Sequence, residues 1–414
     1  MADTLMTVKQ NAKKIVKMAA ADLADATQFF KSVRKVDESD FRSDSTGHNP
    51  GSTISVRIPP KFTVGTTSFD LTSSLQDIKE RAVDLNLDII GTIGFDLDSQ
   101  QLASDVDLGK IYDRFIRPGV LDMAASIESQ MIQKATQAVY NSVGTAWATV
   151  IDSDTVQAGR ELMSKYLCPK DDNRFFLLDS TAMRSAINAN KNMFTFTRKE
   201  YSQGYIGDSM GFAWLENELL YRHTNGNDVT GVAVESTVLV PATGASTIGV
   251  DGVTATTGTI KKGQVFTIAG VNMVHPQTKA DLGIPQQFVV TADATADGSG
   301  NAILSISPTI YSSASGSLQN VSALHADEAA ITFIGSASTT YSQSLMFHKE
   351  AFRVVSSKLV LPNSAEFAEQ ASENGMNIAI VRAWDQLQRR MITRIDFLGG
   401  LVAVRPEWAC RVTN

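Results

Sequence analysis

One pentapeptide of the sequence contains a residue pattern associated with a nucleophilic serine. Gly207-Asp208-Ser209-Met210-Gly211 matches the Gly-x-Ser-x-Gly pattern, which in α/β-hydrolases holds the serine on a strained turn between a strand and a helix. The flanking sequence does not fit that turn, because residues 198–205 are polar and residues 212–215 predict a strand. No His-Gly-Gly-Gly segment precedes the motif. We therefore favour a simple glycine-flanked turn, with a serine hydrolase using Ser209 as an alternative.

Residues that commonly bind metals are too scattered to predict a metal site. The five histidines lack any ligand spacing, and they are His48, His223, His275, His325 and His348. An acidic run beginning at Asp96 is similar to a calcium loop, but Gln101 occupies the position of its turn glycine and Asp107 that of its bidentate glutamate. No glycine-rich phosphate-binding loop occurs either. The sequence therefore predicts no metal, no other cofactor and no catalytic residue.

Composition narrows the possible partners. The 414 residues carry a formal net charge of −7, which argues against nucleic acid or an anionic membrane as the primary ligand, because such binding needs clustered positive charge. No apolar run reaches membrane-spanning length, so we expect no membrane partner. The two cysteines, Cys168 and Cys410, cannot build a disulfide framework and fit a reducing compartment. The length allows two or three domains.

The most distinctive segment of the chain is residues 229–340, which are poor in charge and show no helical period. Short β-type runs predict strands at 237–240, 247–250, 264–269, 287–291, 302–307 and 330–334. Between two of these runs, Asp297-Gly298-Ser299-Gly300-Asn301 is typical of a hairpin turn, because glycine and asparagine tolerate positive φ. We predict an all-β module inserted into an α+β domain whose two flanks form one unit.

The flanks of this module combine helices with strands. Apolar residues three or four positions apart predict a helix over 8–33, and Pro118 begins a longer helix that reaches about residue 142. Shorter helices are predicted at 107–115, 154–167 and 181–188. Apolar runs predict strands at 175–178, 212–220, 354–357, 378–383, 391–397 and 399–404. Strands are thus expected on both sides of the inserted module.

Two alternating runs predict an extended two-stranded arm. Apolar and polar residues alternate over 54–58 until Pro59 and Pro60 end the strand, and the alternation returns over 83–89. The polar stretch 61–81 joins the two runs. An isolated two-stranded ribbon is marginally stable in water unless another surface covers one of its faces. We therefore expect the arm to pack against a neighbouring subunit.

Several of these segments carry a resemblance that extends over nearly the whole chain. The matching segments are 54–60, 82–88, 115–120, 175–183, 206–212, 262–271, 330–335 and 347–352. Together they resemble the major capsid (coat) proteins of tailed bacteriophages, which have the HK97-like fold. Within that group the chain most resembles the podovirus coat proteins that carry an inserted telokin-like β-barrel domain.

The resemblance implies an α+β, HK97-like capsid fold with an N-terminal arm, an extended β-hairpin loop, a long spine helix, a mixed sheet and an inserted antiparallel β-barrel. The expected parts are an N-terminal arm at 1–52, the extended loop and adjoining strands at 53–104, and a peripheral domain with the spine helix at 105–152. An axial domain would begin at 153–228, the inserted β-barrel would occupy 229–340, and residues 341–414 would return to the axial and peripheral domains.

The resemblance also implies a structural, non-enzymatic function. The chain would self-assemble as pentamers and hexamers of an icosahedral shell, with a scaffolding protein and a portal protein as partners, and enclose double-stranded DNA without sequence-specific binding. Assembly would take place in the bacterial cytoplasm, and the protein would end in the capsid shell of the virion. The candidate intersubunit contacts are charged residues of the extended loop and the inserted domain, namely Arg57, Lys61, Lys79, Arg81, Lys279 and Asp281.

The sequence departs from this family in one loop. Some members pair a charged loop of the inserted domain across two-fold contacts, but residues 235–258 carry only Glu235 and Asp251 as charged residues. The segment 275–283, which contains Lys279 and Asp281, is the better contact candidate. An encapsulin-like compartment, which shares the fold and stores a cargo enzyme, is a further alternative.

Overall fold

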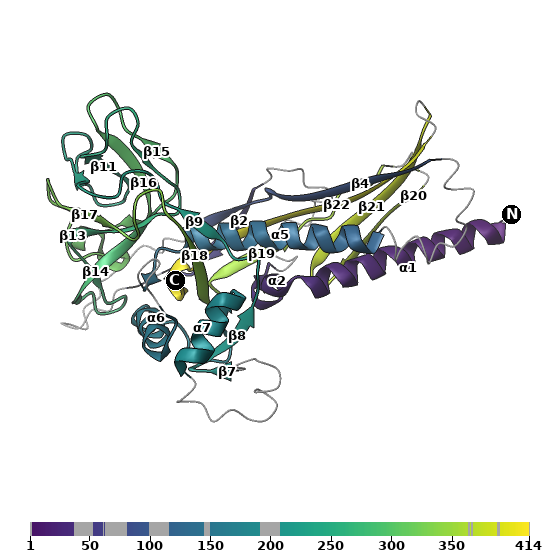
Figure 1. The fold of residues 1–414 in the computed structure, drawn as a ribbon, viewed down its shortest axis with the longest axis horizontal. Helices are drawn as coiled ribbons and strands as arrows, with labels where there is room; N and C mark the ends of the chain where they lie inside the picture. The colour runs from purple at the N-terminus through teal and green to yellow at the C-terminus, as the bar shows by residue number, and fades with distance from the viewer. Residues whose placement is uncertain are drawn as a thin grey trace, which may run out of the picture. The chain divides into compact units, whose positions relative to one another are not determined.

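Figure 1 shows the fold of the chain, a computed structural model. The structure describes residues 2–36, 53–60, 62, 81–98, 116–144, 150–190, 208–362, 365, 367–386 and 390–413. Two compact units each combine segments that are far apart in the sequence. The first contains Met1–Val56, Ala82–Lys134 and Phe352–Val404, and the second Arg57–Arg81, Ala135–Ala351 and Arg405–Asn414. The helix predicted at 107–115 lies outside the described residues.

The first unit begins with two helices where the sequence predicted one. They are α1 (Ala2–Ala26) and α2 (Gln28–Ser32), separated at Thr27, whose backbone is extended. The carboxylate of Glu128, a residue of the spine helix α5 (Arg117–Ala138), accepts hydrogen bonds from the backbone N–H groups of Gln28 at 3.0 Å and Phe29 at 2.7 Å. Because the first N–H groups of a helix lack partners within it, Glu128 stabilises the start of α2.

A six-stranded sheet forms the body of the first unit, in the order β1-β19-β22-β21-β20 with β4 also paired to β22. Its strands are β1 (Arg34–Lys35), β4 (Ile89–Asp98), β19 (Phe352–Ser356), β20 (Phe367–Glu373), β21 (Met376–Asp385) and β22 (Arg390–Ala403). The prediction of two strands over 391–404 is wrong, because β22 is continuous through Gly399 and Gly400. A side chain at Gly400 would collide with the backbone carbonyl of Asn86, so glycine serves close packing there and does not end the strand.

The two strands of the predicted arm are present as β2 (Thr53–Ile58) and β3 (Arg81–Asn86), and they pair as a two-stranded sheet. Ile54, Val56 and Leu85 are buried, while the side chains between them are exposed. The apolar face of this ribbon is therefore covered within a single chain. Packing of the arm against a neighbouring subunit remains a prediction.

The second unit contains a seven-stranded sheet in the order β5-β23-β18-β6-β8-β7, with β9 also paired to β18. Its strands are β5 (Ser142–Val143), β6 (Arg174–Leu178), β7 (Asp208–Ser209), β8 (Phe212–Glu216), β9 (Arg222–Thr224), β18 (Thr340–His348) and β23 (Ala409–Thr413). The helices α6 (Ser153–Lys165) and α7 (Ser180–Asn190) contribute to its apolar core with Phe176, Trp214 and Met346. The sequence predictions for β6, α6 and α7 are confirmed, whereas β23 was not predicted.

Residues 229–340 hold no α-helix and fold around a core of their own, as predicted. Six strands pair in the order β10-β11-β16-β14-β13-β17, and an isolated bridge between Ala233 and Ala330 joins the two ends of this order, so the sheet closes as a barrel. The strands are β10 (Ala233–Val234), β11 (Ala245–Asp251), β13 (Val265–Val274), β14 (Asp281–Val290), β16 (Ala302–Ile310) and β17 (Ile331–Phe333). A small separate pair consists of β12 (Thr259–Ile260) and β15 (Ala294–Thr295).

One predicted strand of the barrel is wrong. Residues 237–240 form a turn and a loop, in which the N–H of Leu239 donates to the carbonyl of Glu235 and the side chain of Val240 is 75% exposed. Pro241 follows and cannot donate a ladder hydrogen bond, which explains why an apolar, β-branched run does not pair here. The other five predicted strands all overlap observed ones. The six-part domain division remains a prediction.

Candidate functional site

The Gly-x-Ser-x-Gly motif forms the turn of a β-hairpin. Ser209 at the end of β7 pairs with Phe212 at the start of β8, and the two residues between them, Met210 and Gly211, have φ angles of 53° and 80°. Two successive positive φ angles are typical of a type I′ turn, which joins two antiparallel strands. The backbone carbonyl of Ser209 accepts a hydrogen bond from the Trp214 indole at 3.2 Å. The motif thus connects strand to strand, whereas a hydrolase nucleophile elbow connects strand to helix.

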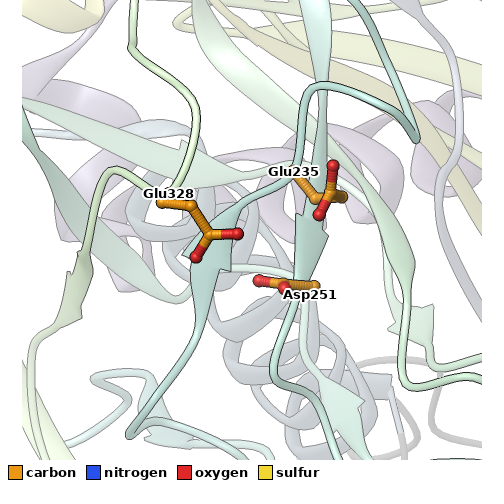
Figure 2. Close-up of side chains that lie close together, drawn as sticks. All are labelled: Glu235, Asp251 and Glu328. Atoms are coloured by element: carbon orange, nitrogen blue, oxygen red, sulfur yellow. The ribbon is translucent and has the colours of Figure 1, made fainter.

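Figure 2 shows three acidic side chains that lie close together, although no pattern in the sequence predicts their proximity. Glu235, Asp251 and Glu328 each place a carboxylate oxygen within 4.8 Å of the others, and among the described residues they are the one group close enough to hold a cation. Strand β10 gathers them, because Val234 pairs with Val250 and its carbonyl accepts the N–H of Glu328. Exposed acidic groups often cluster without a metal, and no second feature at this group indicates one.

The structure places two of the four predicted contact residues of the extended loop, both at its base. Arg57 is exposed near the end of β2, and Arg81 is half-buried at the start of β3. Lys61 and Lys79 lie outside the described residues. The assignment of these four residues to intersubunit contacts remains a prediction.

Lys279 and Asp281 are already bonded within the inserted domain. The Lys279 ammonium donates to the backbone carbonyls of Ser317 at 2.8 Å and Gln319 at 3.0 Å. The carboxylate of Asp281 accepts from the N–H of Gly283 and from the side chain of Asn272, and these hydrogen bonds lower the pKa of Asp281. Lys279 therefore ties the turn before β14 to residues 317–319, and Asp281 stabilises the start of β14. Their part in contacts between copies remains a prediction.

The side chain of Gln287 joins the barrel to the seven-stranded sheet of the second unit, which we call the axial sheet. From β14 it accepts the N–H of Ser142 at 2.7 Å and donates to the carbonyl of Ser142 at 2.8 Å, so it completes the hydrogen bonding of β5 as a neighbouring strand would. The hydroxyl of Tyr166 donates to Gln286 at 3.1 Å. Beside these bonds, Tyr140, Val265 and Val289 form a small buried apolar cluster. The barrel is therefore attached to the axial sheet by side-chain contacts as well as by its two connecting chains.

A buried arginine forms the second attachment. Arg411 in β23 is fully buried, and its guanidinium donates to the carbonyl of Gly263 in the barrel at 2.7 Å and to the Gln343 side chain at 3.2 Å. Burial lowers the pKa of Arg411 to about 10, because no described carboxylate pairs with its charge. The neighbouring His223 is also buried, and burial together with the charge of Arg411 lowers the pKa of its imidazole to about 4. The Arg411 guanidinium thus joins β23 to the barrel at Gly263.

A groove of about 970 Å³ opens beside the first attachment, at Tyr140 and Tyr166, and its described lining residues all belong to the second unit. One wall belongs to the barrel and includes Tyr311, and the other contains Tyr166 and the short helix η4 (Pro406–Trp408). The base of the extended loop contributes Phe62 and Arg81. We call this feature the junction groove. Among the described parts of the chain, no helix has the length and apolar character needed to cross a membrane.

The chain matches the family model described as P22 coat protein, gene protein 5, over residues 31–411. The comparison with curated proteins gave no match. Among solved structures, the chain is similar to one described as Mycobacterium phage Che8, with 12% identity, coverage of 93% of this chain and 90% of the other, and a TM-score of 0.47. The asymmetric unit of the bacteriophage PhiM1 mature capsid is similar with 10% identity, coverages of 94% and 86%, and a TM-score of 0.43.

A third similar structure is the CUS-3 coat protein I-domain, which has 31% identity and covers 27% of this chain and 93% of its own, with a TM-score of 0.17. All three TM-scores are below 0.5, so the assignment rests on the family match. That match includes segments of both compact units and confirms the predicted resemblance to phage coat proteins with an HK97-like α+β fold. The chain therefore belongs to the P22 coat protein family and is a structural, non-enzymatic protein of a phage shell.

Proposed function

We propose that this coat protein assembles as pentamers and hexamers of an icosahedral shell, together with a scaffolding protein and a portal protein, and that the shell encloses double-stranded DNA. The observation that carries the proposal is the family match over residues 31–411, which takes in most of both units. A closed shell needs one subunit to repeat the same contacts around symmetry axes, and many weak contacts then add up to a stable particle.

The charge of the chain fits a container for DNA better than a DNA reader. A formal net charge of −7 gives the protein no electrostatic attraction for phosphate backbones. DNA would therefore enter against repulsion and would be held by the closed shell without sequence-specific contacts. The two free cysteines are both buried, which is compatible with assembly in the reducing cytoplasm of a bacterial host.

The inserted barrel serves in this proposal as an internal brace of the subunit. Support comes from its attachments to the axial sheet, through the Gln287 side chain at Ser142 and through Arg411 at Gly263. Deletion of residues 236–339 is expected to give a protein that aggregates or assembles aberrantly. Normal shells at normal yield from the truncated chain would show that the brace is dispensable.

Electron microscopy of the overexpressed chain, with and without the genes adjacent to its own, tests the main proposal. Closed icosahedral particles are expected when a scaffolding gene is present. The absence of particles under all combinations would contradict self-assembly. Particles that enclose a protein cargo encoded beside the chain would instead support the encapsulin-like alternative, so the contents should be identified by mass spectrometry.

A further inference from the structure

The junction groove has the composition of a protein–protein contact. Tyr166, Tyr311 and Trp408 line it, with Phe62 and Leu167 at 60% and 40% exposure. Aromatic and arginine side chains are the types most enriched at the energetic centres of protein interfaces. Large apolar side chains left exposed beside such a patch indicate a surface that a partner covers. A volume of about 970 Å³ suits a short stretch of chain better than a single side chain.

The centre of the groove is a rigid pair of side chains. The guanidinium carbon of Arg405 lies 4.3 Å from the ring centroid of Trp408, which places the cation over the aromatic face. The Trp408 indole N–H donates to the carbonyl of Tyr166 at 3.1 Å, and the ring of His348 meets it edge-on with centroids 5.5 Å apart. Trp408 is thus fixed on three sides, and it holds Arg405 in one orientation.

The opposite wall is fixed as well. The Asn320 side chain accepts the N–H of Tyr311 at 2.8 Å and donates to the carbonyl of Thr309 at 2.7 Å. The Lys279 ammonium bonds two carbonyls of the same wall. Both walls are therefore formed before any partner arrives, which reduces the conformational entropy lost on binding.

Charge identifies the chemistry of the occupant. Of the described residues that line the groove, Arg81, Lys279 and Arg405 are basic and Glu407 alone is acidic. No described carboxylate forms an ion pair with Arg405 or Arg81. A guanidinium stacked on a ring keeps its N–H edges available, and these edges fit a carboxylate in a two-point contact. The groove is therefore complementary to a segment that carries a carboxylate beside an apolar side chain.

We propose that the junction groove binds a carboxylate-bearing segment of a second copy of this chain, with the Arg405–Trp408 pair as its anchor. A coat protein meets other copies of itself at every position of the shell, and this chain carries 44 acidic residues against 37 basic ones. With three basic residues and one acidic residue among its described lining, the groove is complementary in charge to a second copy whose net charge is negative. A contact between two different patches generates a ring when its rotation closes, and pentamers and hexamers are such rings. This inference rests on the proposed self-assembly.

The test uses shells assembled from equal amounts of unlabelled and ¹⁵N-labelled full-length chain, with the photo-crosslinking amino acid p-benzoylphenylalanine in place of Phe62. Electron microscopy first confirms that shells form, and irradiation and mass spectrometry then identify the crosslinked peptides. Mixed-isotope pairs that join position 62 to a segment containing Asp or Glu are expected. Crosslinks within one chain only, to a different protein only, or no crosslinks in intact shells would overturn the inference and leave the coat function standing. Failure of the unsubstituted chain to form shells would contradict the proposed function itself.

A charge reversal tests the anchor. Arg405→Glu is expected to lower the yield of mixed-isotope crosslinks by about tenfold, or to block shells while the subunit keeps the thermal melting curve of the wild type. The control Arg184→Glu makes the same charge change on the exposed face of α7 and is expected to leave the yield unchanged. Arg405→Lys keeps the charge and loses the planar fork, so an intermediate yield is expected. An unchanged yield in Arg405→Glu, or an equal loss in Arg184→Glu, would overturn the assignment of the anchor.

Discussion

The guanidinium of Arg411 donates a hydrogen bond to the backbone carbonyl of Gly263 at 2.7 Å, and this contact joins the last strand of the chain to the inserted barrel. Arg411 is fully buried, and two of its nitrogens, Nε and Nη2, form no hydrogen bond within the described part of the chain. Burial of an arginine without a carboxylate is costly, so the hydrogen bonds to Gly263 and Gln343 offset only part of the desolvation of the charge.

Arg411→Ala and Arg411→Met should differ in stability. Alanine leaves a cavity and two unpaired acceptors, so a loss of about 3 kcal/mol in the free energy of unfolding is expected. Methionine fills much of the volume and removes the buried charge, and a loss of about 1 kcal/mol or less is expected. Urea unfolding followed by circular dichroism measures both. Both variants remove the charge and both hydrogen bonds, so the difference between them measures the cavity. Equal losses would contradict the role of packing at this position.

His223 should make stability depend on pH. Burial and the nearby Arg411 charge lower the pKa of His223 from 6.5 to about 4, so between these values the unfolded chain binds a proton that the folded chain does not. The contribution of His223 to the free energy of unfolding is therefore fully present above pH 6.5. It falls as the pH drops toward 4, by about 1.4 kcal/mol per pH unit and by about 3 kcal/mol in all.

The variant His223→Gln isolates this effect, because glutamine cannot titrate. Urea midpoints measured between pH 7 and pH 4.5 should fall less steeply for the variant than for the wild type. Burial also lowers the pKa of His325, but both proteins retain that histidine, so its contribution cancels in the comparison. Parallel curves for the two proteins would show that His223 is not the group responsible.

The sequence predicted helices and strands correctly where the spacing of apolar residues matches the buried face of the element. Five of the six barrel strands, the strand β6 and the helix α7 contain apolar residues at the spacing that their surroundings require. The sequence did not predict β23, because all five of its residues are buried, including the polar Arg411 and Thr413. The alternation of apolar and polar residues that marks a half-buried strand is therefore missing there. Residues 237–240 show the opposite case: their apolar side chains predicted a strand, but the segment is a loop in which Val240 is 75% exposed.

The contacts between the barrel and the axial sheet could not be predicted from the sequence. Gln287 and Ser142 are 145 positions apart, and a glutamine in a strand resembles any solvated polar residue until its partner is known. The same holds for the Arg405–Trp408 pair, because the groove needs a barrel wall from a distant segment. Charge alone does not identify an intersubunit contact, because Lys279 is already bonded to carbonyls of its own domain.

Ser209→Ala should have almost no effect. The contact made by Ser209 uses its backbone carbonyl, which the variant keeps, and the turn geometry resides in Met210 and Gly211. A change below about 0.5 kcal/mol in the free energy of unfolding is expected. A fluorophosphonate probe should label neither protein. Stoichiometric labelling of the wild type that disappears in the variant would establish a serine hydrolase.

Glu128→Gln should loosen the start of α2. Oε1 of the buried carboxylate accepts from the N–H groups of both Gln28 and Phe29, and Oε2 also accepts from Gln28. Glutamine removes the second acceptor and the negative charge that favours these N–H groups at a helix start. A loss of about 1–2 kcal/mol is expected, with faster hydrogen exchange at Gln28 and Phe29. The control Glu161→Gln removes an exposed ion pair with Lys165 and should change stability by less than about 0.5 kcal/mol. Unchanged exchange at residues 28 and 29 would contradict the capping role of Glu128.

Gln287→Leu should weaken the coupling between the barrel and the axial sheet. Leucine is apolar and of similar size, so it removes both hydrogen bonds to Ser142 without opening a large cavity, and a loss of about 2 kcal/mol is expected. The control Gln157→Leu lies on the exposed face of α6 and should be close to neutral. Hydrogen exchange should accelerate at Ser142 and Val143 in the first variant only. If the barrel braces the subunit, Gln287→Leu should also lower the yield of shells more than Gln157→Leu does. Equal yields with faster exchange at β5 would show that the contact stabilises β5 but is not needed for assembly.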